Sequence, residues 1–402
     1  MARAIVPVAG NLTRVTRTAA AETVYLDWSA TAPLRPEAAQ AWQRWATHVG
    51  NPSGSHRDAR TARRVLDDAR DTFAELLGCD PGAVVFTSGG TEADDLAVQG
   101  VLDAAAPGAF AVCSAVEHHA VLDPVLARGG MTVPVDRDGV VRPDVLAEGL
   151  RSAAAAGPVA VVSILAVNNE TGVRQPVEDL VAVVREHAPG AVVHVDAVAA
   201  FCWTDVARTT ASADLVTVSA HKFGGPQGVG VLVVRDGVRL AARLVGGTQE
   251  RGRRAGTPNV AGIAAAAAAA SATAADRTDT VARVEGLRDR LAAGVLAVPG
   301  VVPTLGPMAE RVAGTLHVCV RGVDSEPLLF LLDEGGVRAS AGSSCQSGAR
   351  RRSHVVDAMG VDPDLGRGAL RFSLGHGTTT ADCDRAVEVF AAAVDRLREV
   401  AP

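Results

Sequence analysis

The sequence predicts an α/β protein in which a large domain, with a mostly parallel sheet covered by helices, is joined to a smaller α+β domain. Three observations support this fold class. The chain has 402 residues, and that length favours two domains over a single core. Between about residues 84 and 235, short apolar runs rich in β-branched residues alternate with helical patterns. These runs are nearly continuous, which is typical of strands buried on both faces of a parallel sheet.

The large domain is predicted from six strands and the helices between them. The expected strands are 83–88, 109–116, 159–167, 191–197, 215–220 and 229–234. Helical periodicity covers 91–105 and 177–187, and an Ala-rich run over 261–275 predicts a buried helix. Ligands of parallel sheets lie beyond the carboxyl ends of the strands. We therefore expect the polar residues that end these strands to form the functional site.

The smaller domain is predicted from residue 276 onward. Its expected elements are a helix over 276–297, a strand over 315–323, a helix over 325–335, a strand over 369–374 and a helix over 380–399. We divide the chain into a flexible extension (1–24), a large domain (25–275) and a small domain (276–402). Residues 25–35 are expected to pack on the small domain. The Gly/Ser-rich stretch 340–353 is predicted to be an exposed loop.

Composition narrows the classes of function. The net charge of −6 argues against a protein that binds nucleic acid or an anionic membrane surface directly. No apolar run is long enough to span a bilayer. The 6 Cys residues are scattered without the paired spacing of a metal site, so we expect no metal. Dispersed thiols in a long chain indicate a cytoplasmic protein.

Lys222 is the only lysine among 39 Lys and Arg residues. A coding bias that replaces Lys by Arg explains the scarcity, and it makes the one remaining Lys informative. Arg cannot deprotonate in a protein, so it cannot supply the neutral amine that a Schiff base needs. Lys222 is therefore a candidate for covalent chemistry, although a Lys whose ammonium reaches the surface is the simpler alternative.

Several strand ends carry groups that suit a phosphorylated pyridine. The strand–turn–helix of residues 84–100 opens a helix near Thr91, where backbone N–H groups favour a phosphate. Asp196 ends a buried strand, where a carboxylate needs a partner such as a protonated pyridine nitrogen. Ser219, His221 and Lys222 follow another strand, before glycines that permit close backbone approach. Each of these three strand-end patterns is by itself weak evidence for a cofactor site.

Together these segments resemble the fold-type I pyridoxal-phosphate enzymes, and more narrowly the group I cysteine desulfurases of the class-V aminotransferase family. The resemblance covers nearly the whole chain after residue 24, in family order. The matching segments are YLDWSATAP (25–33), GNPSGSH (50–56), FTSGGTEADDLA (86–97), VEHHAVL (116–122), VNNETGV (167–173), HVDA (194–197), SAHKFGGPQGVG (219–230), GGTQERGRRAGTPNV (246–260), GSSCQSG (342–348), SHVVDAMG (353–360) and ALRFSLG (369–375).

The resemblance implies a fold-type I transferase with pyridoxal 5'-phosphate bound to the large domain. Lys222 would form the Schiff base and later move protons. Asp196 would pair with the pyridine nitrogen, and His118 would stack on the ring and act in acid–base steps. The residues implied to hold the phosphate are Gly90, Thr91, Ser219 and His221. Without the motifs, His118 and His221 would be interpreted as ordinary histidines.

Two further residues extend these implied roles. Asn169 would lie near the ring hydroxyl and the substrate. Thr257 would reach the phosphate held by a partner subunit, which implies a homodimer.

The sulfur chemistry depends on Cys345 and Arg371. Cys345 lies in the predicted exposed loop near several Arg residues, which favour a thiolate. Arg371 suits bidentate binding of a carboxylate, although a surface or helix-packing Arg is an alternative. The function implied is conversion of L-cysteine to L-alanine. A persulfide would form on Cys345 and pass to a sulfur-acceptor protein.

Three positions depart from the family pattern. Ala199 replaces a Gln expected to bond the ring hydroxyl, and losing such a bond costs about 1.5–3 kcal/mol. Asp94 and Asp95 replace an Asn pair and would add negative charge beside the phosphate helix. Arg352 replaces a Pro, giving a basic run that would either dock an acidic sulfur acceptor or be merely solvated.

Two other hypotheses stay open at this stage. One is another fold-type I reaction, such as that of a selenocysteine lyase or an aminotransferase, because Lys222, Asp196 and Arg371 would serve any of them. The other is a non-catalytic sulfur-relay scaffold in which Ala199 and the Asp pair have eroded activity. The products formed from L-cysteine would distinguish these alternatives.

Overall fold

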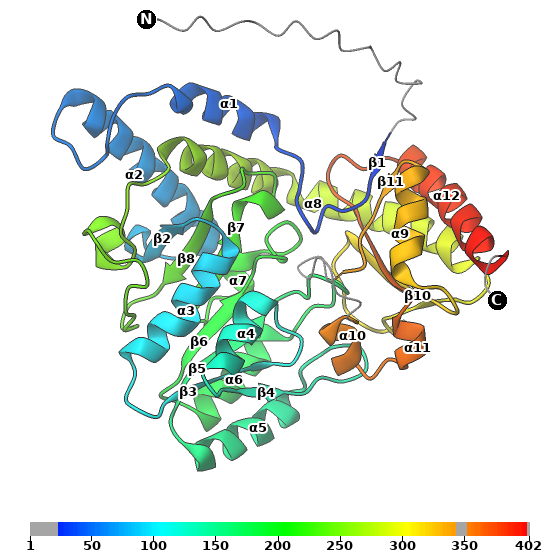
Figure 1. The fold of residues 1–402 in the computed structure, drawn as a ribbon. Helices are drawn as coiled ribbons and strands as arrows, with labels where there is room; N and C mark the ends of the chain where they lie inside the picture. The colour runs from blue at the N-terminus through cyan, green and yellow to red at the C-terminus, as the bar shows by residue number, and fades with distance from the viewer. Residues whose placement is uncertain (1–22, 343–351, 400–402) are drawn as a thin grey trace, which may run out of the picture.

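A computed structural model describes residues 23–342 and 352–399 of the chain. The predicted flexible extension lies almost wholly outside these residues, and so does Cys345. The described residues form two sheet-based parts with separate hydrophobic cores (Figure 1). We call them the large domain and the small domain. The limits 25–275 and 276–402 stay predictions.

A seven-stranded sheet in the order β2-β8-β7-β6-β5-β3-β4 forms the centre of the large domain. Strands β3 to β7 run parallel to their neighbours, whereas β8 is antiparallel to both β7 and β2. This mostly parallel sheet confirms the predicted α/β class. The strands are β2 (Val84–Thr87), β3 (Phe110–Ser114), β4 (Met131–Val133), β5 (Val159–Leu165), β6 (Val192–Asp196), β7 (Leu215–Ser219) and β8 (Gly230–Val234).

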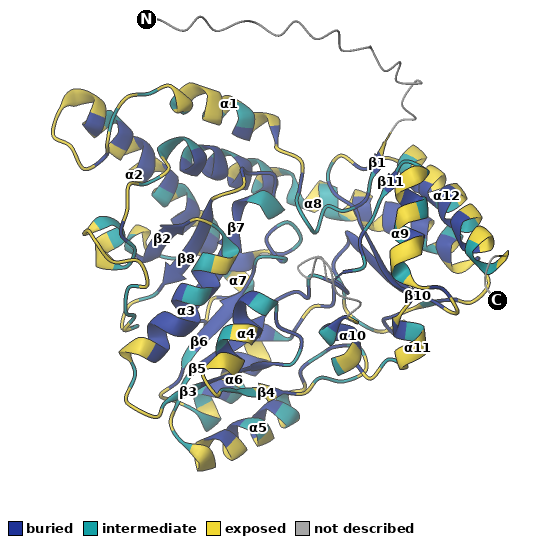
Figure 2. Ribbon diagram, viewed as in Figure 1, coloured by how far each residue is buried: buried dark blue, intermediate teal, exposed yellow. Residues whose placement is uncertain are grey.

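Helices cover both faces of this sheet because successive strand residues point to opposite sides. Val84 and Phe86 enter one core, whereas Val85 between them enters the core under α3 and α4. Both faces are therefore buried, and the strands are almost uniformly dark in Figure 2. The helices of this domain are α1 (Pro36–Ala46), α2 (Arg57–Leu77), α3 (Gly90–Ala104), α4 (His119–Ala127), α5 (Pro143–Ala156), α6 (Val177–His187) and α7 (Val206–Thr209).

The small domain is built on an antiparallel sheet in the order β12-β10-β9. Its strands are β9 (Val301–Pro303), β10 (Thr315–Val320) and β12 (Ala369–Ser373). The helices are α9 (Ser325–Glu334), α10 (His354–Ala358), α11 (Pro363–Gly366) and α12 (Thr380–Glu399).

The start of the described chain lies against the small domain. Strand β1 (Val24–Tyr25) pairs in parallel with β11 (Val337–Arg338), and Asp27 forms a bridge with Ser373. Val24 and Leu26 are buried in the core of the small domain. The chain then crosses to the large domain, where Ala32 N donates to His221 O. This crossing segment passes directly beside Lys222.

A single helix, α8 (Val260–Leu296), joins the two domains. The sequence analysis separated an Ala-rich helix from a helix over 276–297, but the structure continues one helix through both. Its Ala-rich first half is buried in the core of the large domain, and Val284, Leu287 and Leu291 are buried in the small one. In the part of the chain that the structure describes, no helix is long and apolar enough to cross a membrane.

Gly314 offers a test of the contact between the domains. A Cβ at Gly314 would collide with the indole ring of Trp203, which belongs to the large domain. Overpacking of this kind costs about 1–3 kcal/mol, so Gly314→Ala should lower the free energy of unfolding by that amount. Urea denaturation measures the change.

Gly286→Ala is the matched control. Gly286 is exposed inside α8, and no described atom lies within 4 Å of an added Cβ. Replacing a helical Gly by Ala should stabilise the protein by about 0.5–1 kcal/mol. An unchanged stability in Gly314→Ala would contradict the packing of Trp203.

Candidate active site

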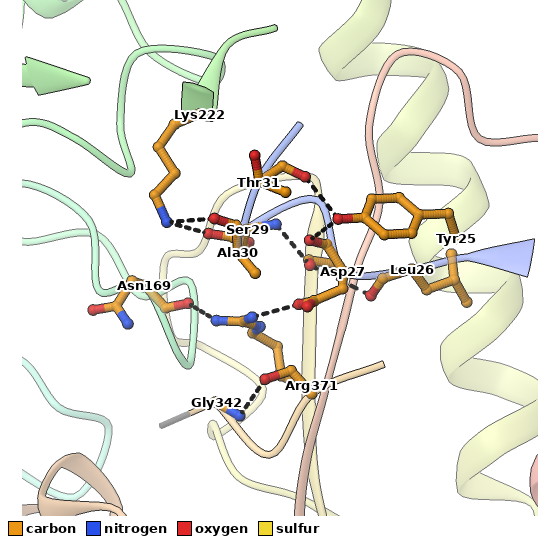
Figure 3. A network of polar contacts seen from close by, with 12 residues as sticks. Tyr25, Leu26, Asp27, Ser29, Ala30, Thr31, Asn169, Lys222, Gly342 and Arg371 are labelled. Carbon is orange, nitrogen blue, oxygen red and sulfur yellow. Dashed lines mark hydrogen bonds and ion pairs between the residues drawn. The ribbon is translucent and has the colours of Figure 1, made fainter. Parts of the chain in front are cut away.

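Lys222 lies directly beyond the carboxyl end of β7, on the 3-10 helix Ala220–Lys222. Its Nζ donates to the carbonyl oxygens of Ser29 at 2.5 Å and Ala30 at 3.2 Å (Figure 3). Both carbonyls belong to the segment that crosses between the domains. The interpretation of Lys222 as a lone surface lysine is therefore wrong, because its side chain is half-buried and points into the junction.

Asp196 ends β6, the strand next to β7, so its carboxyl group lies on the same edge of the sheet as Lys222. The side chain is buried, and Oδ1 accepts a hydrogen bond from Val198 N at 2.9 Å. Burial raises the pKa of Asp196 to about 6, and the charge of Lys222 opposes that shift. A buried carboxyl group with this environment fits a cationic ring nitrogen, which would stabilise its ionised form.

The turn between β2 and α3 fits a phosphate group. Gly89 precedes α3 without a side chain to cap it, so no capping side chain keeps an anion from the first turn of this helix. Gly90 N donates to Ser219 Oγ at 3.3 Å, which joins this turn to the end of β7. A Cβ at Gly90 would lie 3.1 Å from Val198 Cγ2, so the close approach favours glycine. Thr91 is exposed in the same first turn of the helix.

Two histidines face the same region and are neutral at pH 7. His118 caps α4, and its Nδ1 accepts from Ala120 N at 3.1 Å, which leaves the proton of the neutral ring on Nε2. Burial, aided by the charge of Lys222, lowers the pKa of His118 to about 4. The same two causes lower the pKa of His221 to about 4. His221 Nδ1 lies 3.3 Å from Thr31 Oγ1.

The structure buries Asp94, the first member of the Asp94–Asp95 pair that was expected to add negative charge beside the phosphate turn. Asp94 is 2% exposed, and burial together with the nearby Asp196 raises its pKa well above the usual range. Its Oδ1 lies 3.6 Å from His194 Nε2. Burial lowers the pKa of His194 to about 3, so His194 contributes no charge to this contact at pH 7. Asp95, in contrast, is partly exposed and forms an ion pair with Arg243 at 3.1 Å.

Arg371 is 1% exposed, which excludes the surface alternative. From β12 its guanidinium reaches both other parts of the site (Figure 3). Nη1 donates to Asn169 O at 2.8 Å, and Nη2 donates to Asp27 Oδ1 at 2.6 Å. Among the described residues, its buried Nε has no hydrogen-bond partner. The structure thus brings Arg371 and Asn169 together, within the same polar network as Lys222.

Thr257 and Cys345 are the two predicted site residues that the structure does not join to this cluster. Thr257 is exposed in the loop before α8. Cys345 lies outside the described residues. The described cysteines are free thiols: Cys79, Cys113, Cys202, Cys319 and Cys383. Burial raises the pKa of each one, to about 12 for Cys202 and about 11 for Cys383. These thiols are therefore poor nucleophiles.

Ala199 lines a cavity beside Lys222. Trp28, Cys202, Trp203 and His376 also line it. The cavity has a volume of about 50 Å³. Ala199, the position that departs from the family pattern, thus opens onto a small cavity next to Lys222.

Sequence reasoning did not single out several polar residues of this region, although they lie in the matching segments. Asp27 pairs with Arg371, and Glu117 accepts hydrogen bonds from Ser114 Oγ and Leu165 N, both at 2.8 Å. Glu170 Oε2 accepts a hydrogen bond from Ser353 Oγ. Acidic residues inside motif segments were the available signal, but only the fold reveals that Glu117 and Glu170 are buried and that Asp27 is half-buried.

The family model described as aminotransferase class-V matches residues 24–386. The chain is 41% identical to the IscS-like cysteine desulfurase of Mycobacterium tuberculosis, over 94% of this chain and 98% of that protein. It is 42% identical to a cysteine desulfurase of Cereibacter sphaeroides, over 95% and 98% respectively. A solved structure titled NifS-like protein superposes with a TM-score of 0.86 at 30% identity, covering 93% of this chain and 100% of that one.

The burial of Asp196 predicts a pH-dependent stability of the cofactor-free protein. Its pKa is about 6 when folded and about 4 when unfolded. The unfolded chain releases the proton first as pH rises, so stability is lost between these values and the loss is complete above pH 6. Asp196→Asn cannot ionise and should be more stable than wild type at pH 7.5, by on the order of 1–3 kcal/mol.

Urea denaturation at pH 5.0 and 7.5 measures this effect. The advantage of Asp196→Asn should grow by about 1 kcal/mol between the two pH values. Asp68→Asn, at an exposed position of α2, is the control and should show no such growth. A pH-independent difference between Asp196→Asn and wild type would show that Asp196 is already ionised at pH 5.

Proposed function

Because the chain belongs to the aminotransferase class-V family, we propose that it is a pyridoxal-phosphate-dependent cysteine desulfurase. It converts L-cysteine to L-alanine and passes the sulfur through Cys345 to an acceptor protein. One observation carries the proposal: the only lysine lies at a strand end beside a buried Asp196 and an uncapped helix. Relatives at 41% and 42% identity, named as cysteine desulfurases, support the choice of reaction.

Residues from the ends of four strands, β2, β3, β6 and β7, would hold the cofactor. Asp196 would pair with the ring nitrogen, and His118 would lie against the ring. The phosphate is held by the first N–H groups of α3, which include those of Gly90 and Thr91, together with Ser219 and His221. When bound, pyridoxal 5'-phosphate supplies an electron sink for the bonds at the substrate α-carbon.

Lys222 attaches the cofactor and then moves a proton. Its Nζ lies against the carbonyl oxygens of Ser29 and Ala30, which hold the charged amine in position. As a neutral amine, Lys222 would take the α-proton of the substrate. The Lys222 side chain is long and flexible enough to place its amine either at these carbonyl oxygens or at the substrate α-proton.

Arg371 and Asn169 would bind the substrate. The Arg371 guanidinium offers a planar set of donors that suits a carboxylate. One of these donors, Nη2, is occupied by Asp27 at 2.6 Å. Substrate binding therefore needs either a shift of Asp27 or the use of the Arg371 Nε, which lacks a partner among the described residues.

The sulfur step needs no external oxidant. The Cys345 thiolate attacks the substrate sulfur, so an S–S bond forms while the C–S bond of the substrate breaks. The electron pair of the C–S bond stays with the substrate carbon, which takes a proton and becomes the methyl group of alanine. L-cysteine and the enzyme thiol thus yield L-alanine and an enzyme persulfide.

The active enzyme is a homodimer in the cytoplasm. The exposed position of Thr257 before α8 allows it to reach the phosphate held by a second copy of the chain. The free thiols of the described cysteines suit a reducing compartment.

Cys345→Ser tests the reaction directly. The variant should keep the cofactor absorbance, because Lys222 is intact, but lose persulfide formation. Its release of alanine from L-cysteine should fall by more than about 100-fold. Alanine and sulfide are assayed with dithiothreitol present, and Cys79→Ser is the matched control because Cys79 lies outside the site.

Two outcomes would contradict the proposal. Full activity in Cys345→Ser would show that Cys345 is not the thiol that accepts the sulfur. Release of a keto acid instead of alanine by the wild type would favour an aminotransferase. Lys222→Ala should lack the cofactor absorbance altogether.

Ala199→Gln tests the departure from the family pattern. The cavity beside Ala199 leaves room for a longer side chain, and a Gln amide there would bond the ring hydroxyl of the cofactor. We expect kcat to rise about 10-fold. Ala199→Leu, which has similar bulk but no amide, should not raise kcat, and an unchanged rate in Ala199→Gln would show that position 199 does not limit the reaction.

A further inference from the structure

Glu117 is a buried acid in the turn between β3 and α4, directly before His118, and the proposed reaction does not use it. Its Oε1 accepts hydrogen bonds from Ser114 Oγ and from Leu165 N, both at 2.8 Å. Its Oε2 is buried and has no hydrogen-bond partner among the described residues. Within the described part of the chain, Oε1 therefore carries the hydrogen bonds of this carboxyl group.

The bond to Leu165 extends the sheet beyond the point where its backbone ladder ends. Strand β5 lies between β3 and β6 (Figure 1). The pairing of β3 with β5 ends at Cys113 and Ser163, two residues before Leu165. A buried backbone N–H needs an acceptor. Glu117 Oε1 supplies to Leu165 N the acceptor that the backbone of β3 no longer offers.

The end of β5 is joined to Asp196 on its other side. Leu165 pairs with Asp196 in the parallel ladder between β5 and β6, and Ala166 N donates to Asp196 O at 2.8 Å. The end of β5 thus lies between Glu117 and Asp196 and is hydrogen-bonded to both. Because His118 follows Glu117 directly in the chain, these bonds fix the place of His118 relative to Asp196.

Two further contacts hold the turn that carries Glu117. Asn168 Nδ2, from the chain beyond β5, donates to Val116 O at 3.1 Å. His354, at the start of α10 in the small domain, donates from Nε2 to Glu117 O at 2.9 Å, since a carbonyl oxygen can only accept. The turn before His118 is therefore held by both domains.

Glu117 acts here as an acceptor rather than as a charge. Burial, together with the charge of Asp196, raises the pKa of Glu117 to about 8, while the hydrogen bonds from Ser114 and Leu165 oppose that shift. The carboxyl group is therefore mostly neutral at pH 7. An apolar side chain would leave the N–H of Leu165 buried without an acceptor, which is costly. An amide side chain would keep the acceptor.

We propose that Glu117 is a positioning residue that sets the spacing between His118 and Asp196, the groups assigned to the face and the nitrogen of the cofactor ring. It does so by binding the end of β5, which also pairs with Asp196. The roles of His118 and Asp196 toward the ring rest on the proposed function, whereas the bond between Glu117 and Leu165 does not.

Hydrogen exchange tests the bond without any reference to activity. In the cofactor-loaded enzyme and in the cofactor-free chain alike, Glu117→Leu should speed amide exchange of residues 115–118 and 163–168 by about 10-fold or more. Exchange in β7 and β8 should stay as in wild type. Glu117→Gln should exchange like wild type, because its amide oxygen still accepts from Leu165 N. Glu148→Leu, at an exposed position of α5, is the matched control.

The bound cofactor tests the consequence for the ring. Glu117→Leu should raise the apparent Kd for pyridoxal 5'-phosphate about 10-fold, because His118 and Asp196 would no longer hold the ring in one orientation. At saturating cofactor, circular dichroism in the cofactor absorbance band should fall about 2-fold or more for the same reason. The kcat for alanine release should fall about 10- to 100-fold, with KM for L-cysteine within about 3-fold of wild type. Glu117→Gln should restore all of these values.

A second variant covers the case in which Glu117→Leu does not fold. Glu117→Asp then carries the same tests, since its shorter side chain keeps the carboxyl group but withdraws the oxygen from Leu165 N.

The outcomes separate this proposal from the proposed function. Unchanged exchange at 163–168 in Glu117→Leu or Glu117→Asp would overturn the bond to β5. Faster exchange with an unchanged Kd and an unchanged circular dichroism would overturn the role in placing the ring. A Glu117→Gln variant that behaves like Glu117→Leu would overturn the role as an acceptor. A wild-type enzyme that binds no pyridoxal 5'-phosphate would refute the proposed function and leave the exchange result standing.

Discussion

The buried guanidinium of Arg371 is the interaction on which the arrangement of the site depends. It belongs to the small domain, yet it donates at 2.8 Å to Asn169 of the large domain and at 2.6 Å to Asp27 of the crossing segment. Desolvating such a charge is costly unless the group is paired and hydrogen-bonded. Removing either partner would leave a buried charge unsatisfied. The two domains therefore meet in one defined way beside Lys222.

Burial sets the charge of the remaining polar groups around this junction. It raises the pKa values of Asp94 and Glu117, so both are favoured in their neutral forms, and it lowers those of His118 and His194. Apart from Asp27 and Asp196, the polar groups named here around Lys222 and Arg371 are thus favoured in their neutral forms. A cationic ring nitrogen beside Asp196 and an anionic phosphate at α3 would each supply a charge that this environment lacks.

Much of the fold and part of the site could be predicted from local sequence patterns. The six strands and α6 lie close to their predicted positions, because a strand buried on both faces keeps a continuous apolar run. The continuity of α8 was missed, since its apolar side faces one core in its first half and another in its second. The burial of Asp94 was missed for a similar reason. No local pattern states that a carboxyl group on a helix will be fully enclosed.

The sequence alone determined the α/β class, the uniqueness of Lys222 and the set of motif residues at strand ends, because these follow from periodicity, composition and chain order. Only the tertiary structure decided that Arg371 is buried between Asp27 and Asn169. Only it revealed that the buried Glu170 accepts a hydrogen bond from Ser353. These pairs are separated by more than a hundred residues in the chain, and their distances arise only when two domains and a crossing segment pack together.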